Sequence, residues 1–323
     1  MPLPEYLAEV IQSETAKYDR SSLARSAREL TERYKSATFH SPAISGDAHR
    51  AAYLAVRFPA TYAVNEYVFR ELKRLAPEAT IESILDLGAG PGTSSLAASE
   101  VFPEINKATL LEGDQRWLEF GKKLASACPR QELKDSQWQR TDLRSGFPVQ
   151  PHDVVVMSYA IGELTGNNAE TTLRQAWNSA SQFLVLVEPG TPAGFAVINR
   201  ARSFLISTGA YLLAPCPHSG ECPMAGAGDW CHFAQRIQRT AEHRQLKGGS
   251  LGYEDEKFSY LIVSRSAIEP AKARIVRHPR KHTGFLHLNL CTPAGLETKT
   301  VTKSHKSVYK LARHAEWGDS WDE

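Results

Sequence analysis

The chain has 323 residues, 42% of them hydrophobic, which is enough to bury one large domain with an appendage. Its net charge of +2 hides an asymmetry: residues 272–313 hold ten Lys or Arg and one acid, so this segment carries +9 and the rest of the chain −7. No apolar run approaches the roughly 18 residues of a membrane span, and the first residues lack the features of a signal or transit peptide. We therefore expect a cytoplasmic, bacterial-type monomer away from membranes, with reduced cysteines.

The first region, up to about residue 79, has the pattern of helices. Apolar residues recur at three- and four-residue spacing, as at Tyr6 and Val10, which is the periodicity of a helix with one buried face. No motif in residues 1–79 carries chemistry. We read its arginines as charges on solvated helix faces: Arg57, Arg70 and Arg74.

From residue 80 to about 190, apolar strand patterns alternate with helical ones. The strand patterns are Ile84–Leu87, Ala108–Glu112, Val154–Met157 and Phe183–Val187. Strands that alternate with helices form a parallel sheet covered on both faces, so we expect residues 80–190 to form an α/β, Rossmann-like, doubly wound core. Ligands of such sheets bind outside the carboxyl ends of the strands.

A glycine-rich turn, Asp-Leu-Gly-Ala-Gly-Pro-Gly, follows the first strand, and acids follow the next two strands. The candidate cofactor-binding residues are Asp86, Gly88, Gly90, Gly92, Glu112 and Asp142. The glycines let the backbone approach a ligand without an intervening Cβ. Asp86 could bind the amino group of a methionine moiety, Glu112 the ribose hydroxyls and Asp142 an adenine amino group. Because the spacing differs from the Gly-x-Gly-x-x-Gly of dinucleotide sites, we prefer S-adenosylmethionine (SAM) over NAD.

The third region, residues 191–323, holds four cysteines that we assign to a metal centre: Cys216, Cys222, Cys231 and Cys291. Zinc sites usually pair cysteines two to four residues apart, whereas five and eight residues separate the first three here, and Pro follows two of them as at ferredoxin clusters. These residues by themselves leave an iron–sulfur cluster and zinc both open. His218 and His232 are expected around the ligands rather than among them, and Cys128 is expected to be a buried packing residue.

The same region is strongly basic towards the C-terminus. The candidate RNA contacts are Arg274, Arg277, Arg280, Lys281, Lys303, Lys306, Lys310 and Arg313. The last three fall on one face of a helix that Ser304 could cap, and a one-sided cationic stripe can neutralise successive phosphates. The alternatives are a solvated charged face or packing on the acidic remainder of the chain. Because no RNA-recognition motif is present, we expect contacts to RNA backbone and shape.

Several segments resemble the class I SAM-dependent methyltransferases and, more narrowly, the methyltransferase-like proteins of small ribosomal subunit assembly in bacteria and mitochondria. The matching segments are Arg57–Tyr62, Leu85–Thr93, Val187–Pro192 and the cysteine block ending in Trp230–Phe233. The likeness runs from about residue 50 to 312. It implies a class I methyltransferase fold, a role in small-subunit maturation with 16S-type rRNA as partner, and a [4Fe–4S] cluster on the four cysteines.

In a methyltransferase core, the β-rich segments Phe258–Ser264 and Gly284–Cys291 would form the antiparallel pair that closes the sheet. The cysteine block would then be an insertion between the fifth strand and that pair. Cys291, at the end of a strand, would supply the fourth thiolate.

No motif identifies catalytic residues. The segment after the fourth strand, Ser158–Leu164, has neither the Asn/Asp-Pro-Pro-aromatic motif nor the Cys nucleophile of base methyltransferases. Tyr159 and Glu163 are candidates to position or deprotonate a substrate, and structural roles fit them equally. Methyl transfer can proceed by aligning two reactants, so two functions stay open: an enzyme that methylates small-subunit rRNA or a ribosomal protein, and a non-catalytic factor that holds immature rRNA.

Overall fold

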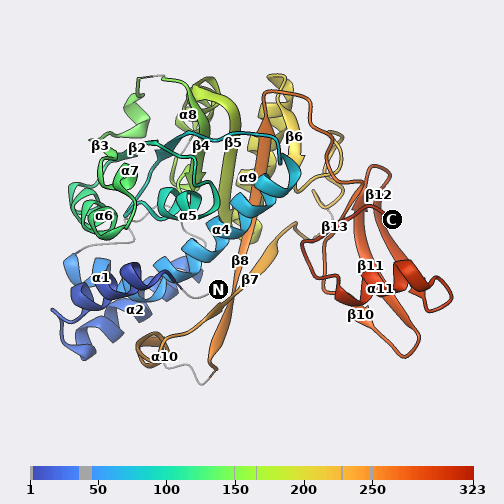
Figure 1. Ribbon diagram of the computed structural model, residues 1–323, viewed down its shortest axis with the longest axis horizontal. Helices are drawn as coiled ribbons and strands as arrows, with labels where there is room; N and C mark the ends of the chain where they lie inside the picture. Colours follow the sequence, from blue (N-terminus) through green and yellow to red (C-terminus); the bar gives the residue numbers. More distant parts are fainter. Residues whose placement is uncertain (1–2, 36–45, 149, 165, 227, 248–250) are drawn as a thin grey trace.

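The computed structural model describes residues 3–35, 46–148, 150–164, 166–226, 228–247 and 251–323 (Figure 1). Its larger sheet has the strand order β3-β2-β1-β4-β5-β8-β6, with β7 paired to the first half of β8. The strands of this main sheet are β1 (Ser83–Leu87), β2 (Lys107–Glu112), β3 (Gln137–Arg140), β4 (His152–Ser158), β5 (Ala180–Pro189), β6 (Tyr211–Ala214), β7 (Phe233–Gln238) and β8 (Tyr253–Ser264).

The first five strands of the main sheet run parallel, and β8 runs antiparallel to β5. Parallel strands are covered on both faces and therefore read as continuous apolar runs. In β4, Val154 and Val156 enter one core, whereas Val155 and Met157 enter the core on the other face. The mixed α/β, class I methyltransferase-like fold predicted from the sequence is thereby confirmed.

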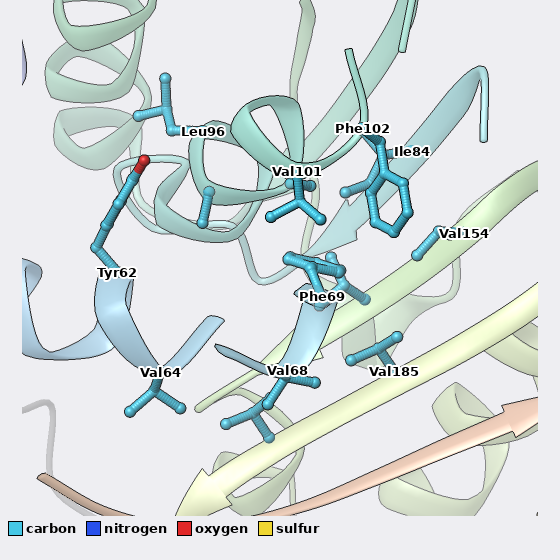
Figure 2. Packing of buried hydrophobic residues seen from close by; sticks show 14 of the residues in the cluster. Tyr62, Val64, Val68, Phe69, Ile84, Leu96, Val101, Phe102, Val154 and Val185 are labelled. Carbon is cyan, nitrogen blue, oxygen red and sulfur yellow. The ribbon is translucent and has the colours of Figure 1, made fainter. Parts of the chain in front are cut away.

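Helices cover both faces of the main sheet. The first face carries α4 (Phe58–Leu75), α5 (Thr93–Val101) and α6 (Gln115–Ala127), and the second carries α8 (Asn167–Ser179) and α9 (Pro192–Ser207). The short elements are α7 (Gln131–Lys134), η1 (Leu143–Ser145), η2 (Ile161–Glu163) and α10 (Ala241–Lys247). Figure 2 shows Val68 and Phe69 of α4 packed against Ile84, Val154 and Val185 of three neighbouring strands.

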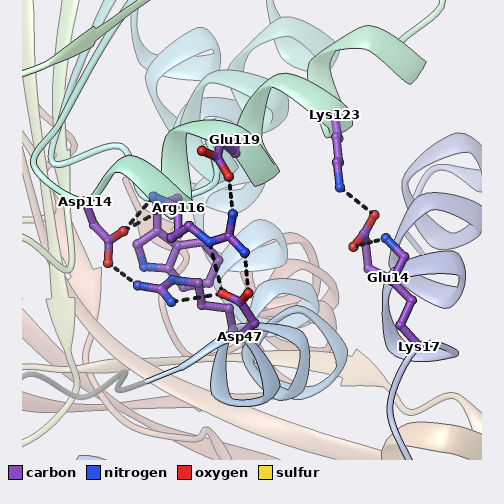
Figure 3. Close-up of polar contacts among 9 residues, drawn as sticks. Glu14, Lys17, Asp47, Asp114, Arg116, Glu119 and Lys123 are labelled. Carbon is purple, nitrogen blue, oxygen red and sulfur yellow. Dashed lines mark hydrogen bonds and ion pairs between the residues drawn. The ribbon is translucent and has the colours of Figure 1, made fainter.

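Three further helices, α1 (Glu5–Thr15), α2 (Arg20–Lys35) and α3 (Asp47–Val56), precede α4. The helical pattern predicted for this part of the chain is confirmed in the described residues. Ion pairs join α1 and α3 to the α6 segment: Glu14 contacts Lys123 at 3.2 Å, and Arg50 contacts Asp114 (Figure 3). Asp114 lies just after the end of β2, so these helices brace the edge where the candidate cofactor residues lie.

One expectation about the N-terminal arginines is wrong. Arg57 is buried, with 9% exposure, and its two Nη atoms donate to Glu256 of β8 at 2.8 and 2.9 Å. A bidentate pair of this kind fixes the α3–α4 junction against the main sheet. Arg70 and Arg74 have half-exposed side chains and pair with acids of their own helix, as a solvated helix face predicts.

The smaller sheet lies at the C-terminal end of the chain (Figure 1). Its strands are β9 (Ala273–Ile275), β10 (Arg280–Lys281), β11 (Phe285–Thr292), β12 (Gly295–Thr302) and β13 (Ser320–Trp321). Strands β9 and β10 follow one edge of β11, and β12 pairs along the other. Helix α11 (Lys306–His314) packs on this sheet through Ala312. None of the described helices has the length and apolar character needed to cross a membrane.

The predicted closing pair of the main sheet is half wrong. Phe258–Ser264 does pair with β5, but its second neighbour is β6 and not the segment Gly284–Cys291. That segment, within β11, alternates buried Leu286, Leu288 and Leu290 with half-exposed residues, a pattern that suits a sheet with one solvent face rather than a strand buried on both. The cysteine block consequently lies between β6 and β7, not between β5 and the pair.

Candidate functional site

The glycine turn joins β1 to α5 at the carboxyl edge of the main sheet. Gly88, Gly90 and Gly92 have φ of +72°, +54° and +80°, which side-chain-bearing residues rarely adopt. A Cβ at Gly88 would lie 2.7 Å from Ala160, and one at Gly92 would lie 2.8 Å from Trp138. A Cβ at Gly90 would meet no atom within 4 Å. The turn is therefore packed against protein at both ends and faces open space at its centre.

Glu112 ends β2 beside this turn. Its carboxylate accepts hydrogen bonds from the backbone N–H of Gly90 at 2.7 Å and of Asp114 at 2.8 Å. Burial raises the pKa of Glu112, although these backbone donors oppose the rise. The glycine turn and the second strand end are thus joined by a carboxylate that lies next to the space at Gly90.

Asp86 is placed differently from the sequence expectation. It is 1% exposed, and its Oδ2 accepts from the backbone N–H of Ser95 at 3.2 Å and from the Ser95 hydroxyl at 2.9 Å. Burial raises the pKa of Asp86 to about 7, and the nearby charge of Glu112 adds to the shift. Asp86 therefore holds the first turn of α5 in place behind the glycine turn.

Asp142 lies at the surface after β3. Its carboxylate caps η1 by accepting from the Arg144 N–H at 3.0 Å, and it pairs with the Arg144 side chain at 2.8 Å. The hydrogen bonds from Arg144 hold the pKa of Asp142 below its usual value. The described structure brings Asp86, Glu112 and the glycines together and leaves Asp142 at the rim.

The carboxyl ends of β4 and β5 add two acids to the same edge. Glu188 is 1% exposed and accepts from the Gly162 N–H at 3.0 Å, and burial raises its pKa to about 8. Glu163 is exposed as a residue, but packing around its carboxyl and the charge of Glu112 raise its pKa to about 6. Glu188 was not assigned as a site residue from the sequence, although it lies in the Val187–Pro192 motif.

Tyr159 has strained backbone geometry, with φ of +57°. Its hydroxyl is buried and has no hydrogen-bond partner among the described residues. Burial raises the pKa of this hydroxyl far above its ordinary value, so the phenol is neutral at any physiological pH.

The four candidate cysteine ligands line one cavity. Cys216 follows β6, Cys222 and Cys231 lie on the loop before β7, and Cys291 lies on β11 of the smaller sheet. The empty space between the lining residues is about 580 Å³, counting the part open to solvent. Residues from both sheets thus meet at this cavity, and the cysteines that line it are up to 75 positions apart in the chain.

Two buried arginines also line the cavity. Arg202 of α9 donates to the backbone carbonyls of His218 and Gly220, both at 2.7 Å. Arg274 of β9 donates to the Pro215 carbonyl at 3.1 Å and to Glu71 of α4 at 2.5 Å. Arg202 Nε and Arg274 Nη2 have no partner within the described part of the chain. Two guanidinium groups with unused N–H donors favour an anionic occupant.

Sequence analysis did not assign Arg202. Helical spacing places it one turn after Ile198, which is buried, and beside buried Ala201. The sequence signal that could have identified Arg202 is a charged residue on the apolar, inward-facing side of a helix.

Three of the four thiols that line the cavity have raised pKa values. Burial raises the pKa of Cys216 and Cys231, and it raises that of Cys291 to about 12. Thiolates are the form that binds metals, so ligation would release protons.

No three His, Cys, Asp or Glu side chains in the described ranges converge closely enough to hold one metal ion. The metal-binding insertion therefore stays a prediction. His218 Nε2 lies 3.8 Å from Cys291 Sγ and borders the cavity, whereas His232 stacks on Trp230 and meets the edge of Trp317. Cys128 is fully buried in the core of the main sheet, as predicted.

The candidate RNA residues separate into two groups. Arg274 is 1% exposed and Arg277 pairs with Asp229, so neither is available as a free cation; burial inside the cavity wall removes Arg274 from the predicted RNA surface. The exposed group is Arg280, Lys281, Lys303, Lys306, Lys310 and Arg313. The predicted helix is present as α11, but its N-cap is His305 rather than Ser304.

Comparison with known protein families identifies the family of this chain. The family described as "Mitochondrial small ribosomal subunit Rsm22" matches residues 47–322. The chain belongs to this family. The human "Ribosome assembly protein METTL17, mitochondrial" is 27% identical over 286 residues, which cover 83% of this chain and 61% of that protein. The Saccharomyces cerevisiae "Ribosome assembly protein RSM22, mitochondrial" is 23% identical over 417 residues, which cover 84% of this chain and 66% of that protein.

The chain thus spans less than two thirds of the length of these two relatives. Among solved structures, magnesium protoporphyrin IX methyltransferase from Synechocystis with bound SAM aligns with a TM-score of 0.44 and 11% identity, over 77% of this chain and 98% of that one. The strand order described above, and not this distant likeness, defines the fold.

The expected cytoplasmic, bacterial-type location is contradicted. The human, Schizosaccharomyces pombe and Saccharomyces cerevisiae relatives are all mitochondrial proteins, which points to mitochondria instead. Cellular location depends on short targeting segments rather than on the folded core. Amino-acid composition, which mainly reflects the folded core, therefore does not decide it.

Proposed function

We propose that this chain is a methyltransferase-fold protein of small ribosomal subunit assembly that binds SAM and contacts the rRNA of that subunit. Membership in the Rsm22 family supports the role in assembly, as do the names of the human and Saccharomyces cerevisiae relatives. The observation that carries the cofactor assignment is the glycine turn, which faces open space at Gly90 and is bordered by Glu112.

The electrostatics of this edge suit a cationic cofactor. SAM carries a sulfonium and an ammonium group, and when bound it supplies an electrophilic methyl group. Burial raises the pKa of Asp86 and Glu188, because their charged forms lose the compensation that water provides. A cationic ligand would restore that compensation. We expect Glu112 to hold the ribose and Asp142, at the rim, to reach the adenine.

Calorimetric titration of the purified protein with SAM and with NAD tests this assignment. We expect SAM to bind and Glu112→Ala to weaken binding, because the carboxylate both holds the turn at Gly90 and borders the open space. NAD binding more tightly than SAM to the wild-type protein would overturn the cofactor assignment.

We also propose that the cysteine cavity holds a [4Fe–4S] cluster, with Cys216, Cys222, Cys231 and Cys291 as ligands. The spacings of five and eight residues between the first three cysteines differ from the pairs, two to four residues apart, of structural zinc sites. Pro follows two of these cysteines, as at ferredoxin clusters. A four-thiolate cluster is anionic, which suits the unpaired N–H donors of Arg202 and Arg274. The cluster would cross-link the loop after β6 to β11.

Metal analysis of anaerobically purified protein distinguishes the two metals. The cluster predicts a brown protein with about four iron and four acid-labile sulfide per chain. Colourless protein with one zinc per chain would keep the site and replace the proposed cluster with the zinc alternative.

One observation supports the alternative function, that of a non-catalytic factor that holds immature rRNA. The Tyr159 hydroxyl and the Glu188 carboxyl lie buried at the ends of β4 and β5, which suits a factor that keeps the fold and binds rRNA without turnover. Glu163 is the exposed acid at the same edge and the candidate to position or deprotonate an acceptor. Incubation with methyl-labelled SAM and immature small subunits separates the two: label in rRNA or ribosomal protein supports the enzyme, and none supports the assembly factor.

A further inference from the structure

An aromatic cluster lies on the smaller sheet, outside both candidate sites. The ring of His282 stacks on Phe285 with centroids 4.7 Å apart and planes 15° apart. His287 meets both rings edge-on, at 5.4 Å from His282 and 5.1 Å from Phe285. His282 is exposed, and the other two are half-exposed.

The strand register places these rings on the outer face of the sheet. Leu286, Leu288 and Leu290 of β11 enter the small core under α11, so Phe285 and His287 point to the opposite face. Across the strands, Phe285 lies opposite Thr302 and His287 opposite both Thr300 and Arg280. We call these six residues the aromatic face: Arg280, His282, Phe285, His287, Thr300 and Thr302.

The charge around the aromatic face is positive. Arg280 lies on it, and Lys303 follows Thr302 directly; both are exposed. Among the described residues, no carboxylate forms an ion pair with Arg280 or Lys303. Hydroxyl groups complete the surface, and the His287 Nδ1 lies 3.0 Å from the Thr300 hydroxyl. Stacked rings bordered by unpaired cations and hydroxyls match the groups of an unpaired nucleotide: a flat base, a phosphate and a 2′-hydroxyl.

We propose that the aromatic face binds single-stranded RNA, with bases extending the stack of His282 on Phe285 and phosphates neutralised by Arg280 and Lys303. This inference rests on the proposed role with small-subunit rRNA and names the kind of RNA segment recognised. Unpaired nucleotides stack on aromatic side chains, whereas the bases of an A-form helix are already stacked and inaccessible. At this face, the proposal adds base stacking to the contacts with RNA backbone and shape that the sequence predicts.

The cationic stripe of α11 provides a comparison within the same sheet. Ala312 of α11 packs into the core beneath the leucines of β11, so this helix covers the face opposite the aromatic rings. The cations of α11 are expected to contact phosphates, in paired and unpaired RNA alike.

Fluorescence anisotropy with a labelled single-stranded oligoadenylate of roughly 12 nucleotides, within the span of one single-strand binding site, tests the proposal. His282→Ala is expected to weaken binding roughly tenfold, the order of one lost base stack, whereas His282→Phe keeps the ring and retains affinity. His314→Ala, an exposed histidine in the last turn of α11, is the matched control and leaves affinity unchanged. Phe285→Leu, which keeps an apolar group in the sheet, is expected to weaken binding in the same way as His282→Ala.

Equal affinity of His282→Ala, His282→Phe and the wild type would overturn the inference, as would wild-type binding to an RNA duplex as tight as to the single strand. Full competition by polyglutamate would show a surface for acidic protein rather than for bases. The proposed function fails separately, if the wild-type protein does not bind isolated small-subunit rRNA. If it binds that rRNA and His282→Ala binds it equally, only the stacking inference falls.

Discussion

At the scale of single residues, the glycine turn and the cysteines show that identical residue types have different roles. Gly92 and Gly90 both have positive φ, but only Gly92 lies against a side chain, that of Trp138. Cys128 is buried and Cys216 is half-buried, and only Cys216 lines the cavity with the other thiols. These differences separate residues that support the fold from residues that meet a ligand.

Substitution of the two glycines separates stability from cofactor binding. Gly90→Ala is expected to cost about 1–2 kcal/mol for its left-handed backbone and to weaken SAM binding at least about tenfold, or 1.4 kcal/mol, because its methyl group fills the ligand space. Gly92→Ala should lose more stability, since its Cβ would lie 2.8 Å from Trp138. Thermal unfolding and calorimetry measure the two effects; undiminished SAM affinity in folded Gly90→Ala would contradict the placement of the ligand.

Cysteine substitution tests the ligand set. Ser in place of Cys216, Cys222, Cys231 or Cys291 should lower iron content and stability, because metal–ligand bonds contribute to folding. Cys128→Ala is the control: it removes a buried thiol from the main core and should keep the full iron content. Iron and sulfide analysis of the purified variants gives the readout, and iron loss confined to Cys128→Ala would refute the assignment.

At the scale of elements, two carboxyl groups at the carboxyl edge of the main sheet are buried where their ionisation is unfavourable. Asp86 and Glu188 come from β1 and β5, and burial raises their pKa values to about 7 and about 8. A carboxyl with a raised folded-state pKa favours folding below its unfolded value and loses that contribution as pH rises through the folded value. The contribution of these two carboxyls to the free energy of unfolding should therefore decrease from about pH 4 to about pH 8 and stay constant above that.

We expect the thermal stability of the ligand-free protein to fall as pH rises from about 4, near which such carboxyls titrate in an unfolded chain, to about 7–8, where these two titrate in the folded protein. SAM affinity should rise through about pH 7–8, since a cation prefers ionised carboxylates. Asp86→Asn removes one titrating group, so its stability should depend less on pH. Unfolding midpoints measured across that range check this, and a wild-type midpoint that rises through the window would contradict it.

Strand β9 joins the two sheets through Arg274. Its guanidinium contacts Glu71 of α4, the Pro215 carbonyl next to Cys216, and Gly318 near the C-terminus. Arg274→Met should cost about 1–3 kcal/mol, because the buried Glu71 carboxylate and the Pro215 and Gly318 carbonyls lose a donor while Glu71 keeps Arg74. Arg280→Met, at the surface of the same sheet, is the control and should be near neutral. Chemical denaturation measures both, and the double variant Glu71→Leu with Arg274→Met should recover part of the loss.

At the scale of the whole molecule, the +9 and −7 parts of the chain are only partly joined to each other. Arg274 and Arg277 pair with Glu71 and Asp229 of the acidic part. The cations of α11 are exposed, and no described carboxylate forms an ion pair with them. This arrangement favours a polyanionic partner over packing on the protein's own acids.

Charge reversal on α11 tests that partner. Replacing Lys306, Lys310 and Arg313 with Glu should weaken binding to small-subunit rRNA. It should also reduce the slope of log affinity against log salt by about 2–3, because fewer phosphate contacts form and fewer counterions are released on binding. Unfolding midpoint and SAM affinity should stay unchanged. A loss of thermal stability with an unchanged salt slope would instead place the helix against the acidic part of the chain.

The sequence by itself determined the local parts of this architecture. The apolar runs at Ile84–Leu87 and Val154–Met157 indicated buried parallel strands, and the glycine spacing indicated a turn that only residues without Cβ can form. Such features depend on neighbours within a few residues, so they can be read without the fold. The clustering of Cys216, Cys222 and Cys231 was also visible, since it is a property of spacing.

Tertiary structure alone decided which distant segments meet. It paired β8 with β6 instead of β11, placed Arg57 against Glu256, and brought Arg202 and Arg274 to the wall of the cysteine cavity. It also turned Asp86 towards Ser95 and gathered His282, Phe285 and His287 on one face. The physical reason is that a buried charge needs an oppositely charged or hydrogen-bonding partner, and a strand edge needs a neighbouring strand. Packing of the whole chain decides which residues fill these roles, and they lie far away in sequence.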